Sequence, residues 1–244
     1  MNKEWYRVAF GEVYPLVYPH RDVAEAVRVA SRLVPMIRRE RPTLDVGCGN
    51  GRYMSALAAE GVDVYGVDLS EFLLAEAAGN PDLSGRLVCG DMRRLPFVPG
   101  AFGSAINMFT SFGYFDSDED NARVLGEVAR VVESGGAFVL DFINSGRVRH
   151  SVRAASRRAQ DGVDVEEFRE LSHDGRVLVK RVRVNCEGRE TVEYAERLRL
   201  YDRDELVAML GDAGFRTEEV HGDYDLGPFD TALSPRLICI CRRS

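Results

Sequence analysis

The chain is poor in several residue types, and some of these scarcities exclude a class of protein. Only Lys3 and Lys180 are lysines, so almost all of the 32 basic residues are arginines, which we attribute to the coding bias of the genome. The net charge of −7 argues against nucleic-acid binding over the whole surface, because phosphate contacts draw on a basic domain or stripe. The five cysteines form no CxxC pair and no histidine lies at metal-ligand spacing, so we expect neither a metal nor a redox motif.

Long apolar runs are also missing. No run approaches the ~20 apolar residues that span a bilayer, and the first residues, MNKEW, lack the apolar segment of a signal peptide. We therefore expect a cytoplasmic protein without a membrane partner. The 244 residues, 45% hydrophobic and 29% charged, fit one large α/β domain or a core domain with a modest insertion.

Strands and helices alternate through the first part of the chain. Residues 43–47 form a short apolar run that ends in glycine, and a helical pattern follows from Tyr53. Residues 63–68 alternate like a buried strand, and Ser70 is a suitable N-cap for a helix that ends near Ala78. Further strands are predicted at 86–90, 102–108 and 137–143, with a helix over 118–132. This alternation predicts a parallel, right-handed, doubly wound α/β sheet.

The pattern changes after Asn144. Residues 163–171, 177–186 and 190–200 alternate apolar and polar side chains and are joined by turns, the first of which is the strong hairpin signal HDG at 173–175. Three consecutive antiparallel strands of this kind predict a small β-meander inserted into the α/β core.

The two ends of the chain complete the plan. An arm with five aromatic residues over 5–18 precedes the first strand, and a helix is predicted over 22–39. After the meander, a helix over 202–213 ends at Gly214, a typical C′ glycine, and strands follow near 215–221 and 236–241. We divide the chain into an N-terminal helical and aromatic lid (1–40), a core (41–146 and 201–244) and an inserted antiparallel sheet that forms a substrate roof or a dimer contact (147–200).

A glycine-rich turn, GCGNG at 47–51, follows the first strand and lets the backbone approach a ligand closely. Asp68 stands at the tip of the second strand, 17 residues beyond Gly51, near the spacing at which a carboxylate reaches a ribose. A dinucleotide site would need a third glycine at position 52, where this chain has Arg52. Asp45, just before the glycines, suits an ammonium group better than a phosphate.

Together, these motifs resemble those of the class I S-adenosylmethionine-dependent methyltransferases. LDVGCGNG at 44–51 looks like the family's first motif, VDLS at 67–70 its acidic second motif, GDMRRLPF at 90–97 its adenine-side loop and VVESGG at 131–136 the turn before the fifth strand. The resemblance implies a Rossmann-like doubly wound sheet of seven strands, the last one antiparallel, here with the inserted meander. It also implies S-adenosylmethionine as the cofactor and S-adenosylhomocysteine as its product.

The resemblance assigns roles to individual residues. The glycine turn would hold the methionine portion, Asp68 would accept the ribose hydroxyls, and Asp91 would receive the adenine amino group, with Met92 beside the ring. The end of the fourth strand would face the methyl group. The implied cofactor residues are Asp45, Gly47, Cys48, Gly49, Asn50, Gly51, Asp68, Leu69, Gly90, Asp91, Met92, Asn107, Met108 and Phe109.

No catalytic residue follows from the motifs, because the sulfonium activates its own methyl group and the protein mainly orients the acceptor. An amine acceptor must arrive deprotonated, whereas a hydroxyl gains from a general base. His20, His221 and Tyr18 are the candidates for such a group, and Tyr114 and Tyr224 are further candidates for positioning a substrate.

The resulting hypothesis is methyl transfer to a nitrogen or oxygen of a small molecule, since methyltransferases for glycine-like amines and amino sugars resemble this plan. The alternative role of the meander is to form the contact of a homodimer.

A second hypothesis is methylation of tRNA or rRNA. It is based on five arginines within 147–158, for which a solvated helix face is the favoured interpretation. A non-catalytic cofactor-binding protein and a nicotinamide-dependent reductase complete the alternatives. The five arginines are Arg147, Arg149, Arg153, Arg157 and Arg158.

Overall fold

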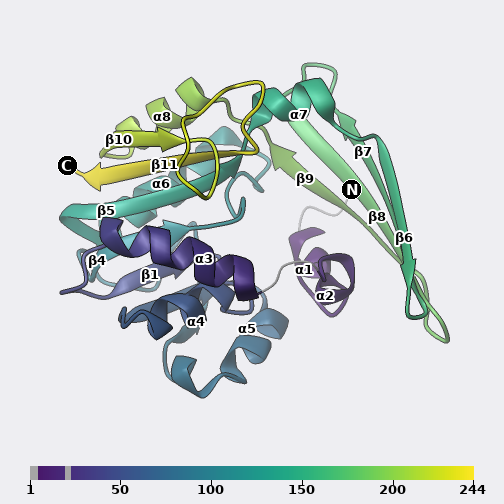
Figure 1. Cartoon of the computed structure of the whole chain (residues 1–244), viewed down its shortest axis with the longest axis horizontal. Coiled ribbons are helices and arrows are strands. Elements are labelled where there is room, and N and C mark those ends of the chain that lie inside the picture. Colours follow the sequence, from purple (N-terminus) through teal and green to yellow (C-terminus); the bar gives the residue numbers. More distant parts are fainter. Residues whose placement is uncertain (1–4, 20–22) are drawn as a thin grey trace.

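The computed structural model describes residues 5–19 and 23–244 and contains two β-sheets (Figure 1). The larger sheet has seven strands in the order β10-β11-β5-β4-β1-β2-β3. Only β11 runs antiparallel to its neighbours β5 and β10, which confirms the predicted doubly wound sheet with an antiparallel last strand. The strands are β1 (Thr43–Val46), β2 (Val64–Asp68), β3 (Leu87–Cys89), β4 (Phe102–Asn107), β5 (Val132–Ile143), β10 (Phe215–His221) and β11 (Arg236–Arg243).

Helices cover both faces of this sheet. One face packs against α3 (Val23–Leu33), α4 (Arg52–Ala59) and α5 (Glu71–Ala78), whereas α6 (Asp118–Val131) and α8 (Arg203–Asp212) cover the other. Local sequence fixes the helix starts: Ser70 accepts a hydrogen bond from Leu73 N, and Asp202 forms a capping box with Glu205. Among the described helices, none is long and apolar enough to cross a membrane. The remaining helical elements are α1 (Trp5–Ala9), α2 (Tyr14–Val17), η1 (Val34–Met36), η2 (Pro81–Leu83) and α7 (Ser145–Ser151).

The predicted helix over 22–39 is too long. The helix α3 ends at Leu33, a short 3-10 turn follows at Val34–Met36, and Ile37 is extended. Pro35 explains the difference, because proline has no backbone N–H to continue the α-helical hydrogen bonds and its ring crowds the preceding turn.

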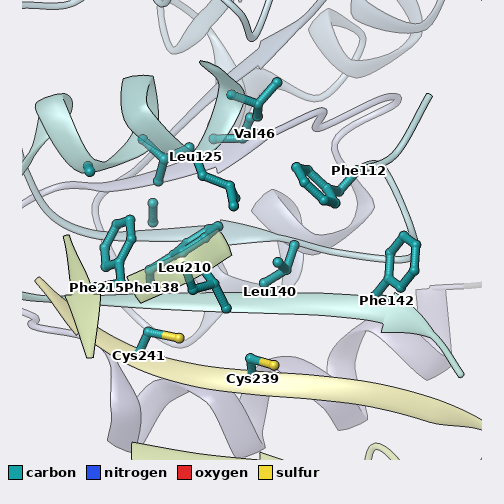
Figure 2. Close-up of a cluster of buried hydrophobic side chains, with 14 of the residues drawn as sticks. Val46, Phe112, Leu125, Phe138, Leu140, Phe142, Leu210, Phe215, Cys239 and Cys241 are labelled. Atoms are coloured by element: carbon teal, nitrogen blue, oxygen red, sulfur yellow. The ribbon is translucent and has the colours of Figure 1, made fainter. Parts of the chain in front are cut away.

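The core lies on the two faces of β5. Alternate residues of this strand face opposite layers, so that Phe138 and Leu140 join the cluster under α6 and α8 while Val139 joins the cluster under α3 and α4. Figure 2 shows Leu125 of α6 over Phe138, and the side chains of Cys239 and Cys241 on the neighbouring strand β11. Burial on both faces fixes the strand register and therefore the positions of the loops at its carboxyl edge.

The inserted sheet has four strands, not the three that were predicted: β6 (Ala155–Gln160), β7 (Val163–Leu171), β8 (Val177–Cys186) and β9 (Val192–Arg199). The strand β6 escaped prediction because its sequence, ASRRAQ, has no apolar alternation. It also places Arg157 and Arg158 on a strand, so the five arginines do not share one helix face. Figure 1 shows α1 and α2 between this sheet and the core, and Val17 of α2 packs with Val165 and Val182 of the insert.

We predict that Leu140→Ala lowers the free energy of unfolding by about 2–5 kcal/mol, because it leaves a cavity beside fully buried neighbours. Val98→Ala serves as the control, since the Val98 side chain is 72% exposed and its truncation should change stability by about 0.5 kcal/mol or less. Urea titration followed by circular dichroism measures both. Equal effects of the two substitutions would contradict this account of the core.

Candidate active site

A cleft of about 980 Å³, counting the part open to solvent, lies at the carboxyl ends of β1, β2, β3 and β4. This edge of a doubly wound sheet is where such folds bind ligands, because the loops that follow adjacent strands diverge there. Twelve of the fourteen cofactor residues implied by the sequence line the cleft: Asp45, Gly47, Cys48, Gly49, Asn50, Asp68, Leu69, Gly90, Asp91, Met92, Met108 and Phe109.

The other two residues, Gly51 and Asn107, do not belong to the lining. A Cβ on Gly51 would lie 2.7 Å from Leu83 Cδ1, so this glycine allows α4 to pack closely against η2. The Asn107 side chain donates from Nδ2 to Val46 O at 2.7 Å and thereby ties β4 to β1. The structure therefore gives both residues a role in shaping the wall behind the cleft.

Asp68 organises the glycine turn. Its Oδ2 accepts a hydrogen bond from Gly49 N and its Oδ1 accepts one from Ser70 N, both at 2.8 Å. Burial raises the pKa of Asp68, and these backbone hydrogen bonds partly offset that effect. The carboxylate thus joins the turn after β1 to the end of β2 in the lining of the cleft.

Asp45 is the most deeply buried acid in the lining of the cleft, with an exposed fraction of 2%. Burial, together with the nearby charge of Asp68, raises the pKa of Asp45 to about 7, although Arg52 lowers it. Among the described residues, its Oδ2 has no hydrogen-bond partner. A buried carboxylate oxygen of this kind is suited to receive a donor group from a ligand.

Asp91, on the adenine side predicted from the sequence, is held by its neighbour Arg93. Arg93 NH2 lies 2.6 Å from Asp91 Oδ2, and NH1 of the same guanidinium lies 3.0 Å from Asp120 Oδ2. Burial raises the pKa of Asp91, but the hydrogen bonds from Arg93 outweigh it, so that the pKa is lowered. Arg93 also stacks over the Phe115 ring at 4.3 Å. The carboxylate is therefore ionised and fixed in orientation.

A buried ion pair shapes the turn after β4. Asp141 of β5 accepts hydrogen bonds from Phe109 N, Tyr224 OH and Arg236 Nε, each at 2.7 Å. Arg236 also donates to Thr110 Oγ1, and both Phe109 and Thr110 adopt a positive φ. No sequence motif indicates this network, because its members lie up to 127 positions apart.

The opposite wall of the cleft is aromatic. Tyr6, Phe10 and Tyr14 from the N-terminal arm meet Tyr114 and Phe115 from the loop after β4. Phe10 lies 5.5 Å from Tyr14 and 5.6 Å from Tyr114, measured between ring centroids. The arm therefore contributes to the lining of the cleft, although its aromatic residues were not among the site residues implied by the sequence motifs.

The structure does not place the two described candidate catalytic groups, His221 and Tyr18, in the lining of the cleft. His20 lies outside the described residues. His221 is not part of the lining, and its Nε2 lies 2.8 Å from Glu219 Oε2. Tyr18 is also absent from the lining, and it donates from its hydroxyl to Glu196 at 2.6 Å under the inserted sheet. Of the positioning candidates, Tyr114 lines the cleft and Tyr224 stands behind it.

Residues 43–136 match the family model described as a methyltransferase domain. The chain is 32% identical over 141 residues to a dTDP-3-amino-3,4,6-trideoxy-alpha-D-glucopyranose N,N-dimethyltransferase of Streptomyces venezuelae, a match that covers 56% of this chain and 58% of the relative. This chain therefore spans little more than half the length of that relative.

Two solved structures match over nearly the whole chain. A S-adenosylmethionine-dependent methyltransferase from Clostridium acetobutylicum superposes with a TM-score of 0.80 at 16% identity, covering 95% of this chain and 96% of the other. The amino pentose methyltransferase CalS10 from Micromonospora echinaspora, solved with S-adenosylmethionine bound, gives a TM-score of 0.69 at 24% identity and covers 96% and 97%. The protein therefore has the fold of class I S-adenosylmethionine-dependent methyltransferases, and its residues 43–136 match the family model of a methyltransferase domain.

We predict that Gly47→Ala destabilises the protein more than Gly85→Ala does. Both glycines have a φ near +70°, which costs an alanine about 1–2 kcal/mol, but only at Gly47 would the new Cβ collide, at 2.8 Å from Ser111 Cβ. The collision should add about 1–3 kcal/mol, measured by urea denaturation. The double substitution Gly47→Ala with Ser111→Gly should recover this addition, and its failure to do so would place the strain elsewhere.

Proposed function

We propose that the protein transfers a methyl group from S-adenosylmethionine to a nitrogen atom of a small-molecule amine. The observation that carries the proposal is one cleft with two unlike walls. A glycine turn with three carboxylates forms the wall on the sheet, and five aromatic side chains form the facing wall. The first wall has the groups that a cationic nucleoside needs, and the second can exclude water from the acceptor.

The residues present fit S-adenosylmethionine. Gly47 leaves no room for a Cβ, which would lie 2.8 Å from Ser111 Cβ, so this glycine lets the turn after β1 pack against the loop after β4 in the lining of the cleft. Asp68 would hold the ribose hydroxyls and Asp91 the adenine amino group, while the buried, unpartnered oxygen of Asp45 would face the ammonium. When bound, the sulfonium supplies an activated methyl group; the chain itself binds and orients the reactants.

An amine acceptor agrees with the side chains around the cleft. Among its described lining residues there is no histidine, and burial raises the pKa of Tyr53 to about 12. A phenol or alcohol would gain from a general base, but Asp45, the lining group with a pKa of about 7, is assigned here to the cofactor's ammonium, whereas a neutral amine is already nucleophilic. The relative from Streptomyces venezuelae is named as a dimethyltransferase of an amino sugar nitrogen, which supports the same choice.

The alternative of an RNA substrate receives less support, because three of the five arginines that suggested it are engaged within the protein. Arg157 pairs with Asp164 at 2.8 Å, Arg149 donates to Gly175 O at 3.0 Å, and Arg158 donates to Val17 O at 3.5 Å. We propose instead that residues 147–200 close the acceptor side of the cleft as a roof, through the contacts of β9 with α1.

A methyl-transfer screen tests the function. The protein is incubated with S-adenosylmethionine carrying a labelled methyl group and with separate pools of amino sugar nucleotides, simple amines, phenols and bulk tRNA. Label in an amine pool, with release of S-adenosylhomocysteine, is the expected result. Label in phenols or tRNA would overturn the choice of acceptor, and binding of the cofactor without turnover in any pool would favour a non-catalytic protein.

We predict that Asp68→Asn weakens the binding of S-adenosylhomocysteine by about 1–3 kcal/mol, because the substitution removes charge-assisted hydrogen bonds to the ribose. Isothermal titration calorimetry gives the affinity, and a thermal melt checks that the variant is folded. Asp63→Asn is the matched control, since Asp63 is a half-exposed aspartate that pairs with Arg86 just before β2. Unchanged affinity in folded Asp68→Asn would count against the assigned ribose site.

The high pKa of Asp45 predicts pH-dependent binding of the cofactor. A ligand ammonium stabilises the ionised carboxylate, so binding lowers the pKa from about 7 and releases a proton. The affinity should therefore rise with pH up to about 7 and fall by up to about tenfold per unit below it. Calorimetry at pH 5.5 to 8 measures the profile, and Asp45→Asn should flatten it while lowering the affinity at pH 8. The same slope in both proteins would assign the titration to another group.

A further inference from the structure

A buried lysine lies on the face of the inserted sheet that is turned toward the N-terminal arm. Lys180 belongs to β8, its side chain is 10% exposed, and it shares a face with Val182 and Val184. Both valines pack with Val17 of α2. The chain has only one other lysine among its 32 basic residues, so a lysine at this place departs from its usage. An ammonium is more compact than a guanidinium and donates in three directions, which suits a confined site with several acceptors.

The ammonium of Lys180 contacts acceptors on two neighbouring strands and on the arm. Nζ lies 3.0 Å from Glu196 Oε2 on β9 and 3.4 Å from Glu167 Oε1 on β7. It also donates to the Tyr18 hydroxyl, and it lies 4.3 Å from the centroid of the Tyr18 ring. Tyr18 in turn donates to Glu196 Oε1 at 2.6 Å, which closes a ring of three side chains. Two strands of the insert therefore hold the residue that follows α2.

The protonation of these groups favours the contacts. Burial raises the pKa of Tyr18, and the nearby charge of Glu196 raises it further, so the hydroxyl keeps its proton and acts as a donor. Burial also raises the pKa of Glu167, but the charge of Lys180 and hydrogen bonds from neighbouring side chains outweigh it, so that the pKa is lowered. Removing the charge of the lysine would leave two mostly buried carboxyl groups without their cation, which is costly.

Tyr18 connects this cluster with the aromatic wall of the cleft. Its ring lies 5.1 Å from the Tyr14 ring, and the Tyr14 ring lies 5.5 Å from the Phe10 ring, both measured between centroids. Tyr14 and Phe10 line the cleft, whereas Tyr18 and Lys180 do not. A contact made under the inserted sheet therefore reaches the wall through a short series of packed rings.

We infer that Lys180, Glu196 and Tyr18 form a latch that fixes the N-terminal arm, and with it the aromatic wall, against the inserted sheet. Lys180 and Glu196 are positioning residues that act on the wall through Tyr18. The latch itself does not depend on the reaction that the protein performs. Its consequence, that the latch sets the affinity for the acceptor, rests on the proposed function, which puts the acceptor beside this wall.

The arm contains a natural probe of its own position. Trp5 on α1 is the single tryptophan of the chain, and it is 5% exposed. Its ring meets the Tyr114 ring, in the loop after β4, edge-on at 5.3 Å between centroids. Release of the arm from the latch would expose this tryptophan to solvent. Quenching of its fluorescence by acrylamide therefore measures the latch without any ligand.

Three variants of the full chain test the latch: Lys180→Met, Tyr18→Phe and the double variant. The first removes the charge, and the second removes only the hydroxyl. Arg183→Met is the matched control, because Arg183 lies on the same strand with its half-exposed side chain on the opposite face, where it pairs with Glu193 at 2.6 Å. Thermal melts followed by circular dichroism check that each variant is folded.

The expected result is a release of the arm in every latch variant. The acrylamide quenching constant should rise at least about twofold in Lys180→Met and in Tyr18→Phe, because a segment that loses its anchor opens locally. The double variant should resemble Lys180→Met, since two residues that act as one unit have effects that do not add. Arg183→Met should be quenched like the unchanged protein.

Kinetics test the consequence for the acceptor. Lys180→Met should raise the KM for the amine that is labelled in the methyl-transfer screen at least about fivefold, whereas the Kd of S-adenosylhomocysteine should change by less than about twofold. This split is expected because the cofactor wall is fixed by the sheet and does not depend on the latch.

Other outcomes overturn the inference in distinguishable ways. Unchanged quenching in folded Lys180→Met and Tyr18→Phe would show that the arm is held without the latch. Additive effects in the double variant would show that the lysine does not act through the tyrosine. Equal weakening of cofactor and acceptor would make Lys180 a general structural residue of the insert. If the unchanged protein labels no amine, the proposed function fails, while the quenching data still decide the latch.

Discussion

The site depends on a buried carboxylate at the centre of the sheet. Asp141 is fully buried on β5, and it accepts hydrogen bonds from the backbone after β4, from a tyrosine hydroxyl and from the guanidinium of Arg236 on β11. A charge in this position is tolerable only because these donors satisfy it. In return it joins three segments and holds Phe109 and Thr110 in left-handed conformations that the chain would otherwise avoid.

The two walls of the cleft differ in how they are held. The wall on the sheet is tied to the most buried part of the core, so the glycine turn and its acids are preorganised for a ligand. Three of the five residues of the aromatic wall come from the segment of α1 and α2, which is secured by apolar contacts with the insert and by the hydrogen bond from Ser70 Oγ to Phe10 O at 2.6 Å. On the proposed assignment of the two walls, a rigid cofactor site facing a separately attached wall allows the acceptor side to vary without disturbing the cofactor side.

Prediction from sequence was most successful where the signal is local. The turn GCGNG, the cap at Ser70 and the alternation of strands with helices each depend on neighbouring residues, and the structure confirms the elements they predict. It failed for β6, whose polar sequence belongs to a sheet edge, and for the end of α3, where proline stops the helix. The aromatic residues of the arm were noticed, but the sequence could not tell which of them turn toward a ligand.

The sequence alone determined the order of the core strands and helices and the acids at the strand ends, because hydrophobic periodicity and strand-end positions are properties of short segments. Only the tertiary structure decided that Gly51 and Asn107 support the wall from behind and that His221 and Tyr18 lie outside the lining of the cleft. It also decided that Asp141 meets Arg236 and that Arg52 lies between two rings. Such contacts join residues whose packing is set by the whole core, and no local pattern of the chain encodes them.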